Sequence, residues 1–270
     1  MNDERHQRHN QREAARTKAK AIREAQKKSL GRKRGLVVGA SVLASIGLVV
    51  GVGFALQGQP VTAADGPSTA IFDGGIRVGK GLQVIAKKDL ASNTVPNIVI
   101  YEDLQCAGCE VFSAPNMAQI RELVTSGSYT VEFHLISYLD GKSVNEYSSR
   151  AANALLCVAD KSPKNFFDFN EALITNVPDV ATAGPSNEEL AVLASKLGVS
   201  EPSTIECIKK PIFSTWAKNI GSSVWTQKVP GTNLEFTDPP FIHVNGDQYL
   251  GDYANAAMFL QWLQTTAPVN

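Results

Sequence analysis

A chain of 270 residues can hold one large domain or two small ones. The formal net charge is zero, yet the first 34 residues carry twelve lysines and arginines against four acidic residues, which leaves the remainder acidic by the same margin. This uneven distribution of charge is unusual for a single globular domain and predicts a separate basic tail at residues 1–34. No nucleotide-binding or nucleic-acid-binding motif stands out, so we expect no nucleic-acid partner.

The next segment, residues 35–56, reads GLVVGASVLASIGLVVGVGFAL and contains no charged residue. It matches the roughly 20 residues that a helix needs to cross a bilayer. Because basic residues stay on the cytoplasmic side, we expect a single-pass protein of the cell membrane with a cytoplasmic N-terminus and an extracytoplasmic domain. Residues 61–63 (VTA) resemble a signal-peptide cleavage site, but the apolar run exceeds the usual length of such a peptide, which favours a retained anchor.

Residues 57–70 (QGQPVTAADGPSTA) are small and polar and predict a linker. Residues 75–86 alternate loosely around glycines and predict an edge hairpin. The β-branched run 98–101 then predicts a buried central strand, and residues 109–126 show helical spacing with Pro115 inside, where we expect a kink. Alternation over residues 129–138 predicts a second strand, with Val131, Phe133 and Leu135 on one face.

A long helical stretch follows at residues 143–228. It holds one predicted helix at 146–159, a second that opens with a capping box at Ser186 and ends at Gly198, and a third near Ser203 that carries Cys207. Strand character returns at 241–244, Asn245-Gly246 predicts a tight hairpin turn to 248–251, and residues 255–265 predict a final helix. This order of strands and helices along the chain predicts a small α/β domain at residues 71–142 and 229–270, split by a helical insertion at 143–228.

The motif Cys106-Ala107-Gly108-Cys109 follows a predicted strand and opens a predicted helix. Free backbone N–H groups and the helix macrodipole stabilise a thiolate at such a position. We therefore expect Cys106 to be the exposed nucleophile and Cys109 the resolving thiol of a disulfide-exchange reaction. Half of a zinc site and a short structural disulfide are the alternatives. Zinc needs about four ligands, and His134 and His243 lie isolated on predicted strands, so we expect no metal and no cofactor.

The other two cysteines, Cys157 and Cys207, lie in two different predicted helices of the insertion. All four cysteines fall on the predicted outer side of the membrane, where disulfides persist. If Cys157 and Cys207 pair, they close a loop of roughly 50 residues and stabilise the domain. A second redox couple is the alternative, and a structural disulfide is favoured because it is the usual role of additional cysteines in secreted proteins.

Four segments resemble the DsbA-like family of thioredoxin-fold oxidoreductases, above all its membrane-anchored actinobacterial forms. They are IVIYEDLQCAGCEVF (98–112), the strand and LD at 129–140, YSSRAANALLCVAD (147–160) and PFIHVNGDQYLG (240–251). The resemblance implies a thioredoxin fold with a helical insertion and a second disulfide there, which fits Cys157 and Cys207. It also implies a substrate-binding cis-proline loop at Pro240, with Pro239 beside it, that faces the cysteines.

The chain departs from this family at three places. Ala107-Gly108 stands where disulfide-forming members have Pro-His, which removes a donor to the thiolate and implies a weaker oxidant. Pro239 stands where the family has Val or Thr and cannot donate a backbone N–H to substrate. Ile100 occupies the position of an acidic residue that aids proton transfer, for which Glu102 or Asp103 could substitute.

The function that we predict is disulfide formation in secreted or cell-envelope polypeptides that contain cysteines. By resemblance, a DsbB-like or VKOR-like membrane protein would reoxidise the cysteine pair. A reductase or isomerase fed by a membrane electron carrier is one alternative, motivated by Ala107-Gly108. A thioredoxin-fold binding or chaperone domain without turnover is the other, motivated by Pro239 and Ile100.

Overall fold

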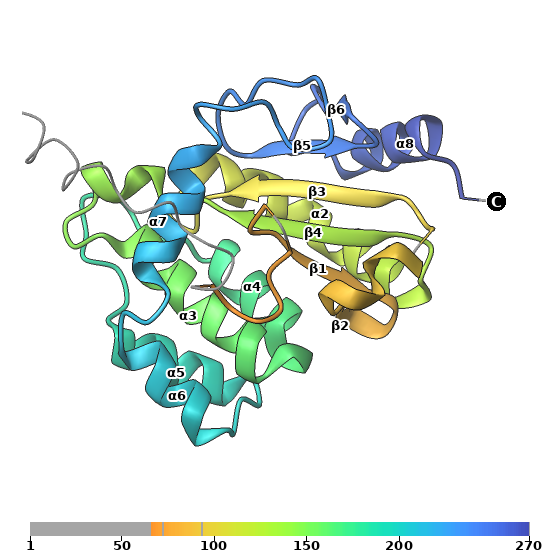
Figure 1. The fold of residues 1–270 in the computed structure, drawn as a ribbon. Coiled ribbons are helices and arrows are strands. Elements are labelled where there is room, and N and C mark those ends of the chain that lie inside the picture. The colour runs from red at the N-terminus through yellow and green to blue at the C-terminus, as the bar shows by residue number, and fades with distance from the viewer. Residues whose placement is uncertain (1–65, 72, 93, 270) are drawn as a thin grey trace, which may run out of the picture. The chain divides into compact units, whose positions relative to one another are not determined.

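A computed structural model describes residues 66–71, 73–92 and 94–269 of the chain (Figure 1). The predicted basic tail, the predicted membrane helix and linker residues 57–65 lie outside the described residues. Among the residues that are described, no helix has the length and apolar character to cross a membrane. All of them belong to one compact unit, Gln59–Asn270.

A six-stranded sheet in the order β2-β1-β4-β3-β5-β6 forms the centre of this unit (Figure 1). Its strands are β1 (Ile76–Gly79), β2 (Gln83–Val84), β3 (Asn97–Glu102), β4 (Thr130–Leu135), β5 (Phe241–Val244) and β6 (Asp247–Gln248). β3 and β4 pair in parallel, and the other neighbours pair antiparallel. The predicted central strand and both predicted hairpins are therefore present, the first hairpin with β2 at the edge of the sheet.

The turn between β5 and β6 follows the chemistry of its two residues. Asn245 and Gly246 both have positive φ, 54° and 86°, which the tight hairpin turn requires and these residue types tolerate. Because this turn ends after two residues, β6 covers Asp247–Gln248 and not the predicted residues 248–251.

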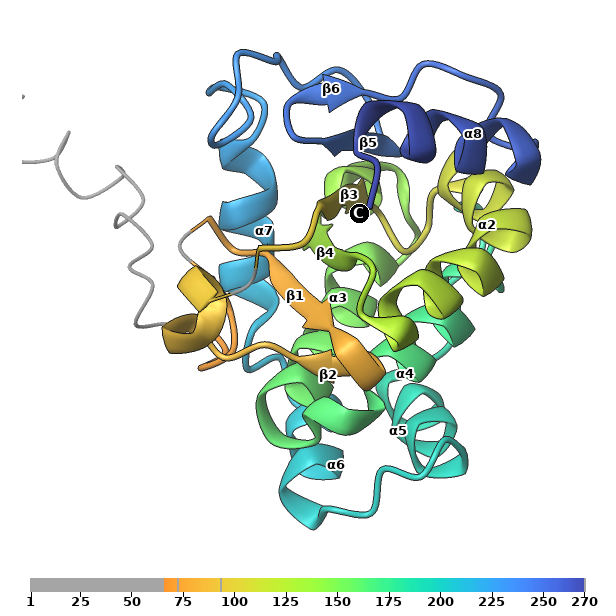
Figure 2. The same ribbon diagram turned by 90° about the vertical axis from the view of Figure 1, so that its right-hand side faces the viewer.

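Two helices, α2 (Ala107–Ser126) and α8 (Ala256–Thr266), lie on the side of the sheet away from α7 (Figure 2). α2 runs through Pro115 without interruption and ends at Gly127, whose φ of 83° gives the left-handed C-cap that favours glycine. Short 3-10 turns connect the elements: η2 (Lys80–Leu82), η3 (Lys87–Ser92), η4 (Tyr138–Lys142) and η5 (Pro163–Asn165).

The helical insertion between β4 and β5 contains five helices, α3 (Tyr147–Lys161), α4 (Phe166–Ile174), α5 (Asn187–Lys196), α6 (Pro202–Lys209) and α7 (Ser214–Ser223). The capping box at the start of α5 is formed, since the Ser186 side chain accepts from the Glu189 backbone and the Glu189 carboxylate accepts from Ser186 N–H. The sequence pattern did not single out α4, in which the three phenylalanines and the polar Asn170 are all buried.

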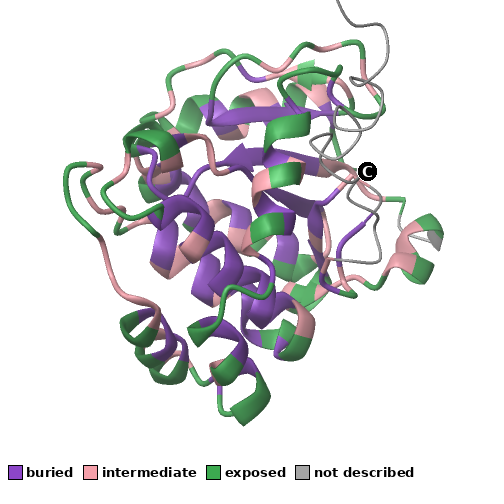
Figure 3. Ribbon diagram, turned by 60° about the vertical axis from the view of Figure 1, so that its left-hand side comes forward, coloured by how far each residue is buried: buried purple, intermediate pink, exposed green. Residues whose placement is uncertain are grey.

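Both faces of the sheet are covered (Figure 3). The main core lies between one face and the helices and includes Ile98, Ile100, Val131 and Phe133. A smaller cluster covers the opposite face, where Val99, Tyr101 and Phe241 meet Val224 and Val229 from the segment after α7. Every residue of β4 is therefore buried, including the polar side chains on the face opposite Phe133.

Candidate functional site

The two free cysteines lie where β3 leads into α2. Cys106 is the N-cap residue of α2, and its Sγ accepts a hydrogen bond from the backbone N–H of Cys109 at 3.3 Å. Cys106 retains 6% of its surface and Cys109 only 1%. The prediction that the first cysteine is exposed was wrong in degree, because the loop before β5 packs over it. Cys106 is nonetheless the more accessible of the two.

The surroundings shift the pKa values of the two thiols in opposite directions. A hydrogen bond from the Cys109 side chain, followed by the backbone N–H groups of Cys109 and Gly108, lowers the pKa of Cys106 against the opposing effect of burial. Burial above all, and then the nearby Cys106, raises the pKa of Cys109 well above its usual value. The arrangement therefore favours a thiolate at Cys106 beside a neutral thiol at Cys109, which is the division of roles predicted for a nucleophile and a resolving cysteine.

The prolines before β5 lie against the cysteine pair. The Pro239–Pro240 peptide bond is cis, and the Sγ of Cys106 is 3.6 Å from the carbonyl oxygen of Pro239. A Cβ at Gly108 would lie 3.4 Å from Cδ of Pro240, an ordinary van der Waals contact, so the loop packs closely against the turn that carries the cysteines. Tyr253 donates its hydroxyl to the carbonyl of Pro240 at 3.0 Å. The structure thus brings together all four residues that the sequence assigned to catalysis and substrate binding.

Asp103 holds the turn that carries the cysteines. Its carboxylate accepts hydrogen bonds from the backbone N–H groups of Gln105 and Leu139, at 2.8 and 3.0 Å, and from the Ser148 hydroxyl at 2.6 Å. Burial raises the pKa of Asp103 to about 6 against these hydrogen bonds. With its oxygens engaged, Asp103 acts mainly as a structural link from the β3–α2 turn to η4 and α3. Sequence reasoning missed Ser148, which only the tertiary fold brings to this turn.

Glu102 is the other acidic residue beside the cysteines. It is 1% exposed, and its Oε1 atom has no hydrogen-bond partner among the described residues. Burial raises its pKa to about 8, with smaller contributions from Cys106 and Asp103, and against a lowering effect of Asn170. A carboxyl with this pKa can give or take a proton near neutral pH.

Glu102 lies on the same face of β3 as Ile100. Alternate residues of a strand point to the same face, so Glu102 lies two residues further along the face that carries Ile98 and Ile100. Ile100 is fully within the main core. Glu102 therefore lies one strand repeat closer to the cysteines than Ile100, and the period of two in β3 was the sequence signal that places Glu102 on this face.

Replacement of Glu102 with glutamine is expected to change how stability depends on pH. A carboxyl whose pKa rises on folding stabilises the folded state below its usual pKa of 4.5, and this contribution is lost as the pH rises through about 8. The parent protein should therefore lose stability across this window, and Glu102→Gln should lose less, above all between pH 6 and 8, where Asp103 contributes little.

Denaturant unfolding of the reduced protein at several pH values would measure this difference. Glu122→Gln, an exposed carboxyl on α2, is the matched control and should keep the slope of the parent. Equal slopes in Glu102→Gln and the parent would contradict a raised pKa at Glu102.

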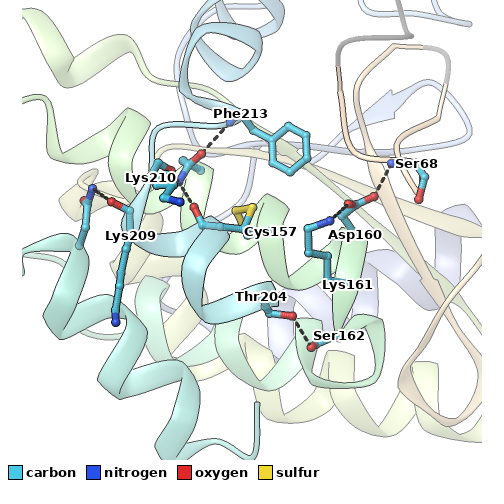
Figure 4. The surroundings of a disulfide bond; sticks show 12 residues. Ser68, Cys157, Asp160, Lys161, Ser162, Thr204, Lys209, Lys210 and Phe213 are labelled. Carbon is cyan, nitrogen blue, oxygen red and sulfur yellow. Dashed lines mark hydrogen bonds and ion pairs between the residues drawn. A yellow bond between two sulfur atoms is a disulfide. The ribbon is translucent and has the colours of Figure 1, made fainter. Parts of the chain in front are cut away.

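The other two cysteines form a disulfide that joins α3 to α6 (Figure 4). Cys157 is fully buried and Cys207 is 4% exposed. Hydrogen bonds connect the same segments, since the Asn153 amide donates to Lys210 and accepts from the Phe213 backbone, and the hydroxyls of Ser162 and Thr204 lie 2.8 Å apart. The burial and this surrounding network fit a structural disulfide better than a second redox couple.

Known proteins with similar sequences and structures include thioredoxin-fold oxidoreductases, in agreement with the geometry of the cysteine pair. A family model described as thioredoxin (Thioredoxin_4) matches residues 91–261, a range that includes the cysteine pair and both prolines. The chain is similar to the reduced disulfide bond oxidoreductase DsbG of Mycobacterium tuberculosis, with 26% identity and a TM-score of 0.58 over 71% of this chain and 86% of that one. For the oxidised DsbA of the same organism the identity is 26% and the TM-score 0.58, over 71% and 91% of the two chains.

The kinase PknE of M. tuberculosis, a serine/threonine-protein kinase, is 28% identical over 169 residues, or 60% of this chain. The match spans only 28% of the length of that curated relative.

Proposed function

Because the chain belongs to the thioredoxin family, as the match over residues 91–261 shows, we propose that it forms disulfide bonds in polypeptides outside the cytoplasm. The chain is a thiol–disulfide oxidoreductase of the DsbA type, whose substrates are proteins that contain cysteines. The observation that favours the oxidase direction is the lowered pKa of Cys106 beside the raised pKa of Cys109. A stabilised Cys106 thiolate favours the reduced form of the pair, so the oxidised form readily passes its disulfide to a substrate.

The proposed reaction begins with an oxidised pair. A substrate thiolate attacks the Sγ of Cys106, the Cys106–Cys109 bond breaks, and Cys109 leaves as a thiolate that takes a proton from Glu102 or from solvent. A second substrate thiolate then attacks the substrate sulfur of the mixed disulfide and releases Cys106 as a thiolate. The substrate loses two electrons, the cysteine pair gains them, and the low pKa of Cys106 makes it a good leaving group.

The reverse reaction uses the same atoms. The Cys106 thiolate would attack a substrate disulfide, and Cys109 would resolve the mixed disulfide after giving its proton to the deprotonated carboxylate of Glu102. Because Ala107 and Gly108 supply no side-chain donor to the thiolate, the oxidising power of the pair rests on the backbone N–H groups and on Cys109.

The reduction potential of the Cys106–Cys109 pair is the measurement that decides between oxidase and reductase. We expect a value well above the about −270 mV of thioredoxin and toward the about −120 mV of strong disulfide donors, because the reduced form is stabilised. The experiment equilibrates the protein with glutathione buffers and follows the redox state by alkylation. A value at or below about −270 mV would instead support a reductase fed by a membrane electron carrier.

A binding or chaperone domain without turnover is the second candidate. Pro239 favours it, since this residue has no backbone N–H to donate to an extended substrate beside Cys106. A pair that stays oxidised across the whole range of glutathione buffers would support this candidate. Reversible titration of the pair would exclude it.

The proposed location is the outer face of the cell membrane, with residues 35–56 as the anchor and residues 1–34 in the cytoplasm. The uncharged run of the anchor and the basic residues before it support this topology. We propose a DsbB-like or VKOR-like membrane protein as the oxidant that restores the Cys106–Cys109 disulfide. Modification of a reduced Cys106 by a membrane-impermeant thiol reagent in intact cells would test the topology.

A further inference from the structure

Polar side chains gather on the face of the sheet that points away from α2. Glu132 and His134 lie two residues apart on β4, and each is 3% exposed. Nε2 of His134 lies 2.6 Å from Oε1 of Glu132. Asp73, which precedes β1, completes the group, because one ligand atom from each of the three side chains lies within 4.8 Å of the other two. None of these residues takes part in the disulfide exchange described above.

Neighbouring side chains hold the group in a fixed orientation. Arg77 and Asn97 both donate to the other carboxylate oxygen of Glu132, from Nε at 2.6 Å and Nδ2 at 3.0 Å, which leaves Oε1 facing His134. The imidazole of His134 stacks on the ring of Tyr101 with centroids 4.3 Å apart. Such outer contacts orient the carboxylate and histidine ligands of metal sites.

A second and independent observation comes from β5. His243 is only 5% exposed, and both of its ring nitrogens lack a hydrogen-bond partner among the described residues. It lines a hollow of about 310 Å³ together with Asp73 and Glu132, and Oδ1 of Asp73 also has no partner there. Burial of unpaired polar groups destabilises the fold, so the hollow is suited to a polar occupant that pairs with them.

The register of the sheet explains why these groups share one hollow. Val99 on β3 pairs with Glu132 on one side and with His243 on the other, and Arg77 on β1 pairs with Glu132. The four residues therefore form one row across β1, β4, β3 and β5. We expected no metal because His134 and His243 lie isolated on predicted strands and zinc needs about four ligands, whereas the strand order brings both histidines to the same face.

We propose that Asp73, Glu132 and His134 bind one divalent transition-metal ion, of which Zn²⁺ is the representative, at the edge of this hollow, which Asp73 and Glu132 line. A fourth position, open to the hollow, would hold a water molecule that pairs with His243. A mixed set of imidazole and carboxylate ligands suits Zn²⁺, whereas Ca²⁺ and Mg²⁺ prefer oxygen ligands alone. The carboxylates of Asp73 and Glu132 would balance the two positive charges of the ion. Arg77 already forms an ion pair with Glu132 and so weakens the attraction of that carboxylate for the ion. We therefore expect tight binding to need all three ligands.

Binding of the ion replaces a hydrogen bond. Nε2 of His134 and Oε1 of Glu132 now share a hydrogen bond of 2.6 Å, and the ion would take the place of the proton between these two atoms, while the neutral imidazole carries its proton on Nδ1.

Isothermal titration of the full-length protein with ZnCl2 tests the proposal. The protein is first oxidised, so that Cys106 and Cys109 cannot act as ligands, and His6 and His9 of the tail are replaced with alanine to remove a competing site. We expect one bound ion per chain and a melting temperature that rises with Zn²⁺. Asp73→Asn and His134→Ala should each weaken binding at least 100-fold, and His243→Ala about 10-fold.

Glu206→Gln, an exposed carboxyl on α6, is the matched control and should bind as the parent does. Failure of the parent to bind Zn²⁺ at about 1 mM, or unchanged affinity in Asp73→Asn, would overturn the proposal. Asp73 lies in a half-buried loop, so this variant keeps the test decisive should His134→Ala not fold. Tighter binding of Ca²⁺ than of Zn²⁺ would overturn the assigned class of ion. Disulfide exchange, measured in parallel, should be unaffected and tests the proposed function separately.

Discussion

Replacement of Cys106 with alanine is expected to abolish disulfide exchange. The Sγ of Cys106 is the sulfur that the helix N-terminus stabilises as a thiolate, and Cys109 is too buried, at 1% exposure, for a protein substrate to reach it directly. The rate at which a reduced, unfolded substrate protein regains its disulfides measures the activity. Unchanged activity in Cys106→Ala would refute the assigned nucleophile.

Two further variants separate chemistry from folding. Cys106→Ser keeps an oxygen that can cap α2, so it should unfold at nearly the same denaturant concentration as the parent and still be inactive. Cys109→Ala retains the nucleophile but cannot resolve, and it should therefore accumulate a mixed disulfide with substrate that is visible on a non-reducing gel. Absence of this adduct would argue that Cys109 is not the resolving thiol.

Removal of the second disulfide in Cys157→Ala/Cys207→Ala is expected to cost about 4 kcal/mol of folding free energy. The bond closes a loop with a sequence separation of 50, and loss of this constraint enlarges the unfolded ensemble. For a domain of this size the melting temperature should fall on the order of 10 °C. Denaturant unfolding with Cys106 and Cys109 oxidised in both proteins would measure the loss.

A matched control removes a different link between the same segments. Ser162→Ala/Thr204→Ala deletes the contact between the two hydroxyls and should cost only about 1 kcal/mol, the usual net value of one hydrogen bond. Exchange activity per folded molecule should be unchanged in the disulfide variant. Loss of exchange in a fully folded Cys157→Ala/Cys207→Ala protein would instead show that this pair is a second redox couple.

Short-range patterns predicted much of the fold. The β-branched run at 98–101, the Asn245-Gly246 turn and the capping box at Ser186 all depend on residues close together in sequence, and the structure confirms each of them. The CxxC motif between a strand and a helix is of the same kind, because a helix N-terminus is a local feature. The order of these elements predicted a small α/β domain split by a helical insertion, and the resemblance implied the thioredoxin fold.

Other features were decided only by tertiary structure. The burial of Cys106 depends on the loop around Pro239, which is 133 residues away in sequence. The distinct roles of Asp103 and Glu102 depend on Ser148 and Asn170, which two helices of the insertion bring beside the β3–α2 turn. Local periodicity contains no information about such partners.

The sequence by itself determined most of the strands and helices, although not α4 or the bounds of β6, and where a reactive cysteine pair begins a helix. The order of the strands determined the rest, because neighbours in a sheet need not be neighbours in the chain. With β3 between β4 and β5, residues more than 100 positions apart, such as Glu132 and His243, flank the same Val99. Hydrogen bonding between strands sets these distances, and no local pattern of residues records them.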